Sequence, residues 1–202
     1  FFEFESLSQD SISAASSSRG IVMSCTGRNM GFTKQAFVDI GGYNDISHFI
    51  SGDDDLLLHK ITNNPLYRCE FILDKEAVIY SPPPDSIAQF IQQRLRFASK
   101  GTTYYNIKTP TSLKLILPLL YISNLTVLLT LFIFIQSVNS IWLLPWIIKF
   151  ISDAIITYIF YYGIQIKWSI KTIFLLSLMH PLYISLFGII GPFSNFKWKS
   201  DE

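Results

Sequence analysis

The distribution of hydrophobic and polar residues divides the chain into two unlike halves. In the second half, long apolar stretches at residues 113–135, 141–162 and 170–190 are separated by short polar breaks. Each stretch has about the 20 residues that a helix needs to cross the hydrocarbon core of a membrane. Because lipid offers the backbone no hydrogen-bonding partner, we expect three transmembrane helices, joined as hairpins through residues 136–140 and 163–167.

The first half alternates between helical and strand-like patterns. Helix caps at Thr33 and Asp85, and apolar positions at helical spacing after Asp85, support the helix assignments. The expected helices cover residues 1–18, 33–40, a segment that starts at Asp53 or Asp54, and 85–100, the last lying beside the membrane. Short apolar runs predict strands at 21–25, 67–73 and 77–80. The sequence therefore predicts an α/β domain at 1–105, transmembrane helices within 106–195 and a short tail at 196–202.

Composition supports this division and narrows the class of protein. Hydrophobic residues make up 50% of the chain and charged residues 15%, against about 25% charged in average soluble proteins. The net charge of +1, without a basic run, gives no indication of nucleic-acid binding. Cys25 and Cys69 lack CxxC spacing and a neighbouring His cluster, so we expect reduced structural thiols and no metal site. The chain begins Phe1-Phe2-Glu3 without Met, and we expect a fragment whose natural start lies upstream.

Lysines around the apolar stretches predict their orientation. Three lysines precede the first stretch and two lie in or after the second break, whereas the first break has none: Lys100, Lys108, Lys114, Lys167 and Lys171. The positive-inside rule then places the soluble part and the 163–171 turn in the cytoplasm. We expect a multi-pass protein of the plasma (inner) membrane, in contact with membrane lipids.

Two features complicate this simple topology. The tail is also basic at residues 196–199, which conflicts with three full spans and suggests that one stretch is interfacial or re-entrant. The second stretch is the weakest candidate for a span because it contains Lys149 and Asp153. These residues, four apart on one helix face, either form a pair near an interface or mark an intramembrane functional site.

The first candidate for chemistry is a run of three carboxylates, Asp53, Asp54 and Asp55, which follows Gly52 at the start of a predicted helix. One Asp suffices to cap a helix, and carboxylates at this end are stabilised by the helix dipole. Because adjacent residues point in different directions, one can cap while another is available as a general base.

The second candidate is the segment Gln93-Arg94-Leu95-Arg96-Phe97, directly before the membrane. Guanidinium groups can bind a diphosphate with two parallel hydrogen bonds. Alternatively, a basic helix beside a membrane is attracted to anionic lipid.

Several short motifs occur in a characteristic order along residues 1–105. They are Gly27-x-Asn29, Lys34, Gly41-Gly42-Tyr43, Ser51-Gly52-Asp53-Asp54 and Gln93-x-x-Arg96-Phe97, followed by membrane helices. In this order they resemble the membrane-bound family-2 glycosyltransferases of the inverting GT-A type, which include cellulose, chitin and hyaluronan synthases and ceramide glucosyltransferase. The resemblance implies that residues 1–105 are the C-terminal half of a GT-A domain.

The resemblance also implies roles for individual residues. The family's acidic pair ends in the base that deprotonates the acceptor, which corresponds to Asp54 in Asp53-Asp54, although a register with Asp53 or Asp55 as the base stays open. The implied substrate-binding residues are Gln93, Arg94, Arg96, Phe97, Gly27 and Asn29, with Phe97 in place of the family's Trp. The implied reaction transfers a hexose from a nucleotide-diphospho-sugar to a lipid-linked or polysaccharide acceptor, with inversion.

One departure from the family is large. The family's N-terminal half binds the uridine, and its Asp-x-Asp motif coordinates Mg²⁺ or Mn²⁺. Asp53-Asp54-Asp55 formally contains Asp-x-Asp, but it follows the wrong elements and lacks the hydrophobic strand that precedes the family's motif, so neither feature is recognised here. The resemblance therefore implies a metal for the full-length enzyme whose ligands lie outside this chain. The alternative is a non-catalytic membrane-anchored remnant, or a half enzyme that depends on a partner.

Overall fold

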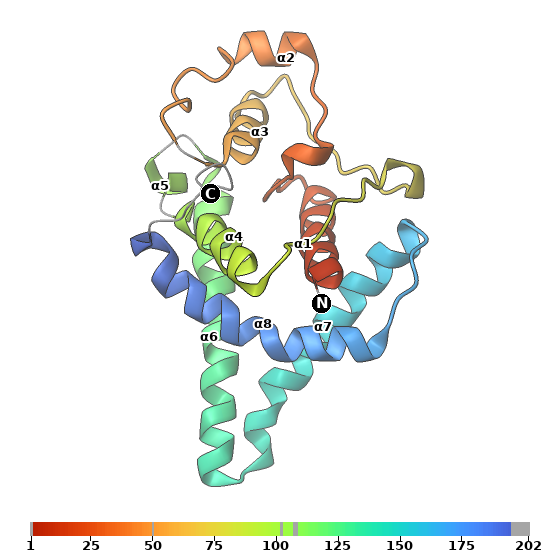
Figure 1. Ribbon diagram of the computed structural model, residues 1–202, viewed down its shortest axis with the longest axis vertical. Helices are drawn as coiled ribbons and strands as arrows, with labels where there is room; N and C mark the ends of the chain where they lie inside the picture. Colours follow the sequence, from red (N-terminus) through yellow and green to blue (C-terminus); the bar gives the residue numbers. More distant parts are fainter. Residues whose placement is uncertain (1, 50, 102, 107–108, 195–202) are drawn as a thin grey trace.

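The structure, a computed structural model, describes residues 2–49, 51–101, 103–106 and 109–194. All of its regular elements within these ranges are helical (Figure 1). The first half contains α1 (Phe2–Ser17), η1 (Gly27–Asn29), α2 (Lys34–Asp39), α3 (Asp53–Asn63), η2 (Lys75–Ala77), α4 (Ile87–Ser99) and α5 (Thr103–Asn106). The second half contains α6 (Thr111–Ser137), η3 (Ser140–Leu143), α7 (Leu144–Gly163), α8 (Ile170–Ile190) and η4 (Gly191–Phe193).

The predicted α/β fold is wrong for the described residues, which contain no strand or sheet. The segments at 21–25, 67–73 and 77–80 are not hydrogen-bonded as a sheet, and the α/β half of a GT-A domain is therefore not formed. An apolar run becomes a strand only when a neighbouring strand pairs with its backbone. Apolar side chains in this region lie open instead, with Leu66 78%, Ile72 70% and Tyr80 78% exposed.

The helix caps agree with the sequence more closely. The side chain of Thr33 accepts a hydrogen bond from the Ala36 N–H (3.1 Å), as its position before α2 predicts. Before α4, the cap is Ser86 rather than Asp85: Ser86 Oγ accepts from the Gln89 N–H at 3.2 Å. Gln89 Oε1 in turn accepts from the Asp85 N–H at 3.0 Å, so the two side chains fix the start of α4 together.

The three helices of the second half are long and apolar enough to cross a membrane: Thr111–Ser137, Ser140–Gly163 and Ile170–Phe193. Figure 1 shows α6 and α7 as a hairpin that extends away from the first half, while α8 runs across α6. α8 contacts α1 and α4 as well as α6 and α7. The first half therefore packs on both α7 and α8, because α1 contacts both of these helices and α4 contacts α8. The basic tail at 196–199 lies outside the described residues.

The polar residues of α7 are paired, as one of the two sequence hypotheses predicts. Lys149 Nζ lies 2.5 Å from Asp153 Oδ2, and Ser177 Oγ of α8 donates to the same oxygen at 2.6 Å. The carboxylate therefore has both a cation and a hydrogen-bond donor as partners, which offsets the cost of placing it among apolar helices. The contact also ties α7 to α8.

The first half is fixed onto the membrane helices by a hydrophobic cluster and by a close contact. Leu56 and Leu57 of α3, Tyr104 of α5 and Leu113 of α6 belong to one buried cluster, so α3 is held against the start of α6. The close contact is made by Gly191, which follows the last residue of α8 and lies directly against α4. A Cβ at Gly191 would come within 2.3 Å of the Ala98 Cβ and 3.0 Å of its carbonyl carbon.

This contact gives a first prediction. Replacing Gly191 with Val should lower the free energy of unfolding by about 1–3 kcal/mol, because the added atoms overlap α4 and the backbone must shift. Thermal unfolding in detergent, followed by circular dichroism, measures the change. Gly31→Ala is the matched control, since a Cβ there meets nothing within 4 Å. Equal midpoints for Gly191→Val and wild type would contradict the close packing of η4 on α4.

Candidate functional site

The three consecutive carboxylates at the start of α3 point into three different environments. Gly52, with a left-handed φ of 93°, precedes them and turns the chain into the helix. Asp53 is exposed, Asp54 is partly buried and Asp55 is buried. The N-cap is Gly52, and no side chain caps the helix, so none of the three carboxylates takes the capping role that the sequence suggested.

Asp55 is the structural member of the three. Its Oδ1 accepts hydrogen bonds from Ser24 Oγ (2.8 Å) and the Cys25 N–H (2.9 Å). Its Oδ2 accepts from Lys100 Nζ and Tyr104 OH, both at 3.2 Å. Burial and this neighbouring carboxylate raise the pKa of Tyr104 well above its ordinary value, so the phenol stays a donor. Both oxygens of Asp55 are therefore occupied in joining the 24–25 segment to α5.

Asp54 is oriented but still reachable. Its Oδ2 accepts a hydrogen bond from the Gly27 N–H at 2.8 Å, and its Oδ1 accepts from the Asp55 N–H at 2.9 Å. Lys100 Nζ lies 3.8 Å from Oδ1, and the Asp54 side chain is 25% exposed. Two backbone N–H groups and a lysine ammonium therefore surround this carboxylate. A Cβ at position 27 would lie 3.3 Å from Asp54 Oδ2, so glycine allows this close approach.

Arg96 and Phe97 of α4 lie near this carboxylate. Burial of the guanidinium lowers the pKa of Arg96, while the nearby carboxylates of Asp54 and Asp53 act in the opposite direction. The Arg96 Cζ lies 5.3 Å from the centre of the Phe97 ring, and Lys100 Nζ lies 5.4 Å from it. The site thus combines a partly exposed carboxylate with a guanidinium that stacks on an aromatic ring.

The next two predicted site residues, Gln93 and Arg94, lie in different surroundings from Asp54 and Arg96. Arg94 is buried and forms an ion pair with Glu5 of α1, and its Nη2 donates to Gln93 Oε1 at 3.0 Å. The Cζ atoms of Arg94 and Arg96 both lie over the Phe97 ring, 4.8 and 5.3 Å from its centre. The structure joins Gly27 to Asp54 by a hydrogen bond and pairs Arg94 with Glu5 of α1, while Asp54 acts on Arg96 electrostatically.

The remaining predicted residue, Asn29, holds a loop. Its Nδ2 donates to the Ala77 carbonyl oxygen at 2.8 Å, which fixes η1 against η2 and so positions the neighbouring Gly27. Sequence reasoning missed Lys100 as part of the site, although it lies only three residues after Phe97. It also missed Glu5, which no local pattern connects to Arg94, 89 positions away.

The carboxylates do not converge as metal ligands do. Both oxygens of Asp55 are taken by protein donors, and within the described residues no group of three or more His, Cys, Asp or Glu side chains could hold a metal ion. The residues present therefore do not fit the Mg²⁺ or Mn²⁺ that the sequence resemblance implies.

No protein-family model matches the chain, and no curated protein or solved structure matches it either. Function must therefore be argued from the arrangement of the residues.

The charged residues of α1 give a pH prediction. Burial and the nearby Glu5 carboxylate raise the pKa of Asp10 from 3.8 to about 6. Between these two values the folded chain binds more protons than the unfolded chain, so this group makes stability fall as pH rises from about 4 to about 6. Asp10→Asn should raise the unfolding midpoint at pH 7 and flatten its decrease over this window. Unfolding midpoints measured across the window test this, with the exposed Asp45→Asn as a control that should keep the wild-type slope.

Proposed function

We propose that this chain is the acceptor-side part of a membrane-bound sugar transferase whose base is Asp54. One observation carries the proposal: the partly exposed carboxylate of Asp54 is held by the backbone N–H of Gly27, 27 positions away, beside the ammonium group of Lys100. The Gly27 N–H holds the carboxylate at 2.8 Å, and Asp54 acts electrostatically on Arg96. Such an arrangement can remove a proton and stabilise a nearby negative charge.

In the proposed reaction, a hydroxyl of the acceptor gives its proton to Asp54. The hydroxyl oxygen then attacks the anomeric carbon of a nucleotide-diphospho-sugar from the side opposite the diphosphate. The bond from that carbon to the diphosphate oxygen breaks, and Arg96 stabilises the negative charge that the leaving group acquires. Lys100 is a positioning residue, because its Nζ lies near both Asp54 and Asp55.

The acceptor is proposed to be lipid-linked or a growing glycan, because the site lies close to the apolar helices. α4, which carries Arg96, contacts α8 and η4, and α3 belongs to the buried cluster that includes the start of α6. The proposed orientation places residues 1–105 on the cytoplasmic side of the plasma (inner) membrane, where nucleotide-sugars are available. α1 then packs on α7 and α8 at the cytoplasmic side.

The alternative is a half enzyme that needs a partner chain. The exposed apolar side chains of Leu66, Ile72 and Tyr80 favour it, because a partner could cover them. Activity that is present in membranes and returns to the purified chain only when a second protein is added would favour this alternative.

A donor screen tests the proposal. Membranes from cells that produce the complete gene product are incubated with a panel of radiolabelled nucleotide-sugars, and label is counted in the extractable lipid and the insoluble polymer. One donor should label one of these fractions above the level of membranes that lack the protein. Labelling equal to that background with every donor would contradict the proposal.

A further inference from the structure

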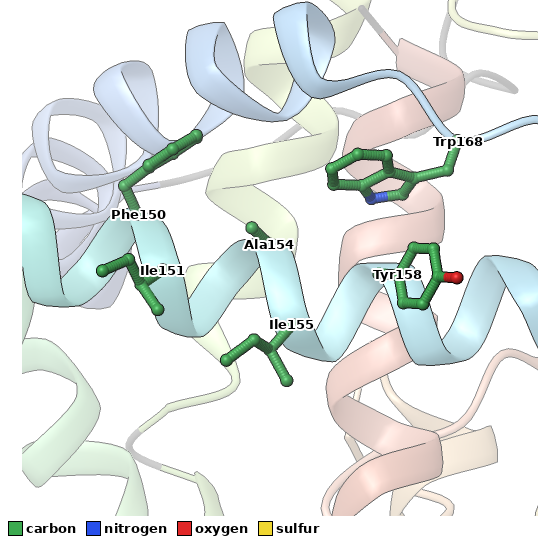
Figure 2. A pocket seen from close by; sticks show the side chains of 6 residues that line it. All are labelled: Phe150, Ile151, Ala154, Ile155, Tyr158 and Trp168. Atoms are coloured by element: carbon green, nitrogen blue, oxygen red, sulfur yellow. The ribbon is translucent and has the colours of Figure 1, made fainter.

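An apolar pocket lies on the membrane half of the molecule, away from Asp54. Its volume is about 290 Å³, and it is lined by Phe150, Ile151, Ala154, Ile155, Tyr158 and Trp168. Figure 2 shows that Trp168 reaches over α7 from the segment before α8, and that the small side chain of Ala154 leaves the hollow between the larger ones. We call this pocket the α7 groove.

The walls of the α7 groove are held in place by defined contacts. Trp168 Nε1 donates to Thr157 Oγ1 at 3.2 Å, so its polar edge is satisfied and its ring forms a wall. The Trp168 ring meets the edge of Tyr158 with centroids 5.7 Å apart. At the other end, Phe150 packs edge to face on Phe174 of α8 at 5.5 Å. The groove therefore offers a ligand mainly carbon surface.

Its size and surroundings indicate what can fill it. The groove follows α7 from residue 150 to residue 158, about 12 Å at the rise of an α-helix, close to half the thickness of a hydrocarbon core of ~30 Å. α7 belongs to a helix that is long and apolar enough to span a membrane. In a membrane, a lipid acyl chain will fill such a hollow, because the side chains that line it lose van der Waals contacts when it is empty.

Charge at the Trp168 end indicates the head group. Lys167 and Lys171 flank Trp168 in the chain; both are exposed, and neither forms an ion pair with a described residue. α8 begins beside them, and its N-cap residue Ser169 makes no side-chain hydrogen bond to the open N–H groups. Two ammonium groups and the positive end of a helix dipole all favour a negatively charged partner.

We infer that the α7 groove binds one acyl chain of an anionic phospholipid, whose phosphate lies beside Lys167 and Lys171. This site is separate from the proposed transfer reaction. The bound lipid holds the junction between α7 and α8 at the cytoplasmic leaflet of the membrane.

Quenching of Trp168 fluorescence by lipids with brominated acyl chains tests the inference directly. The chain is reconstituted with Trp142→Phe, Trp146→Phe and Trp198→Phe, which leaves Trp168 as the only indole. Brominated phosphatidylglycerol is then compared with brominated phosphatidylcholine at equal fractions. We expect phosphatidylglycerol to be preferred by at least about fivefold in relative binding constant, the scale of attraction of one lysine near an anionic membrane surface.

Three variants separate the groove from general lipid contact. Lys167→Gln combined with Lys171→Gln should remove the preference while leaving quenching by phosphatidylcholine unchanged. Ala154→Phe should fill the groove and lower quenching by both lipids. Ile159→Phe places the same aromatic ring at an exposed position of α7 outside the groove and should keep the preference.

Equal quenching of Trp168 by the two lipids would overturn the inference, as would a preference that survives Ala154→Phe. A chain that retains only Trp142, in the η3 turn, should show no preference, and an equal preference there would also overturn it. Displacement of either lipid by a polyprenyl phosphate, without a preference for phosphatidylglycerol, would assign the groove to a lipid-linked acceptor instead.

Discussion

Replacing Asp54 with Asn should lower the rate of sugar transfer by about 10³-fold, the middle of the range for losing a general base. The amide keeps the shape of the side chain, and its oxygen can still accept the hydrogen bond from the Gly27 N–H, 2.8 Å away in the wild type. It cannot take a proton from an acceptor hydroxyl. The initial rate at saturating donor measures the effect. Binding of the donor should be unchanged, because the substitution leaves Arg96 in place.

The neighbouring carboxylates provide matched controls for this prediction. Asp53→Asn changes an exposed side chain one position away and should leave rate and stability close to wild type. Asp55→Asn removes the charge that Lys100 contacts at 3.2 Å, and should destabilise the fold by about 3–5 kcal/mol as broken buried pairs do. Asp54→Asn should stay within about 1 kcal/mol, since its contact with Lys100 is longer and partly exposed. If Asp54→Asn keeps the wild-type transfer rate while a folded Asp53→Asn variant loses it, the base is Asp53 instead.

Replacing Arg94 with Met should lower the free energy of unfolding by about 3–5 kcal/mol, the largest stability effect expected outside Asp55. Arg94 and Glu5 form an ion pair and are 7% and 1% exposed. Gln9 Nε2 and Tyr183 OH donate to the same Glu5 oxygen, at 2.7 and 3.1 Å, so α1, α4 and α8 meet at this carboxylate. Without Arg94, the Glu5 charge is left buried without its cation.

The pH dependence and a double variant distinguish this explanation from a simple loss of packing. Burial raises the pKa of Glu5 from 4.5 despite the Arg94 charge. Without Arg94 the pKa of Glu5 rises further. The cost of Arg94→Met should therefore stay constant while Glu5 is protonated in both folded chains, and should grow once the pH exceeds the wild-type Glu5 pKa, which lies above 4.5. Adding Glu5→Leu should restore most of the lost stability, because no unpaired charge remains. Chemical unfolding in detergent measures each variant; a cost that is independent of pH and not relieved by Glu5→Leu would contradict the ion-pair account.

The sequence predicted features that depend on neighbouring residues. The three apolar helices follow from length and hydropathy, and each predicted stretch lies inside one of the observed helices. The Thr33 cap and the Lys149–Asp153 pair are also confirmed, since both join residues three or four positions apart. The order of motifs led to Gly27, Asp54 and Arg96, of which the structure joins Gly27 and Asp54 by a hydrogen bond.

Features that depend on distant residues were not predictable in this way. The strand at 67–73 was wrong, because an apolar pattern does not reveal whether a pairing strand is present. Composition alone could not show that Asp55 is buried while Asp53 is exposed. That difference arises because four residues distant in the sequence donate hydrogen bonds to Asp55: Ser24, Cys25, Lys100 and Tyr104. The sequence pattern predicted a role in substrate binding for Arg94, whereas its guanidinium forms an ion pair with Glu5 of α1.

The central claim is that Asp54 acts as a base in a direct displacement on a nucleotide-sugar at the membrane surface. The anomeric configuration of the first sugar-containing product tests it most directly, and proton NMR of the product labelled with ¹³C at the anomeric carbon reads it. The account predicts a configuration opposite to that of the donor, because the acceptor oxygen attacks from the side opposite the diphosphate. A product with the donor's configuration, or no product from any nucleotide-sugar, would contradict it.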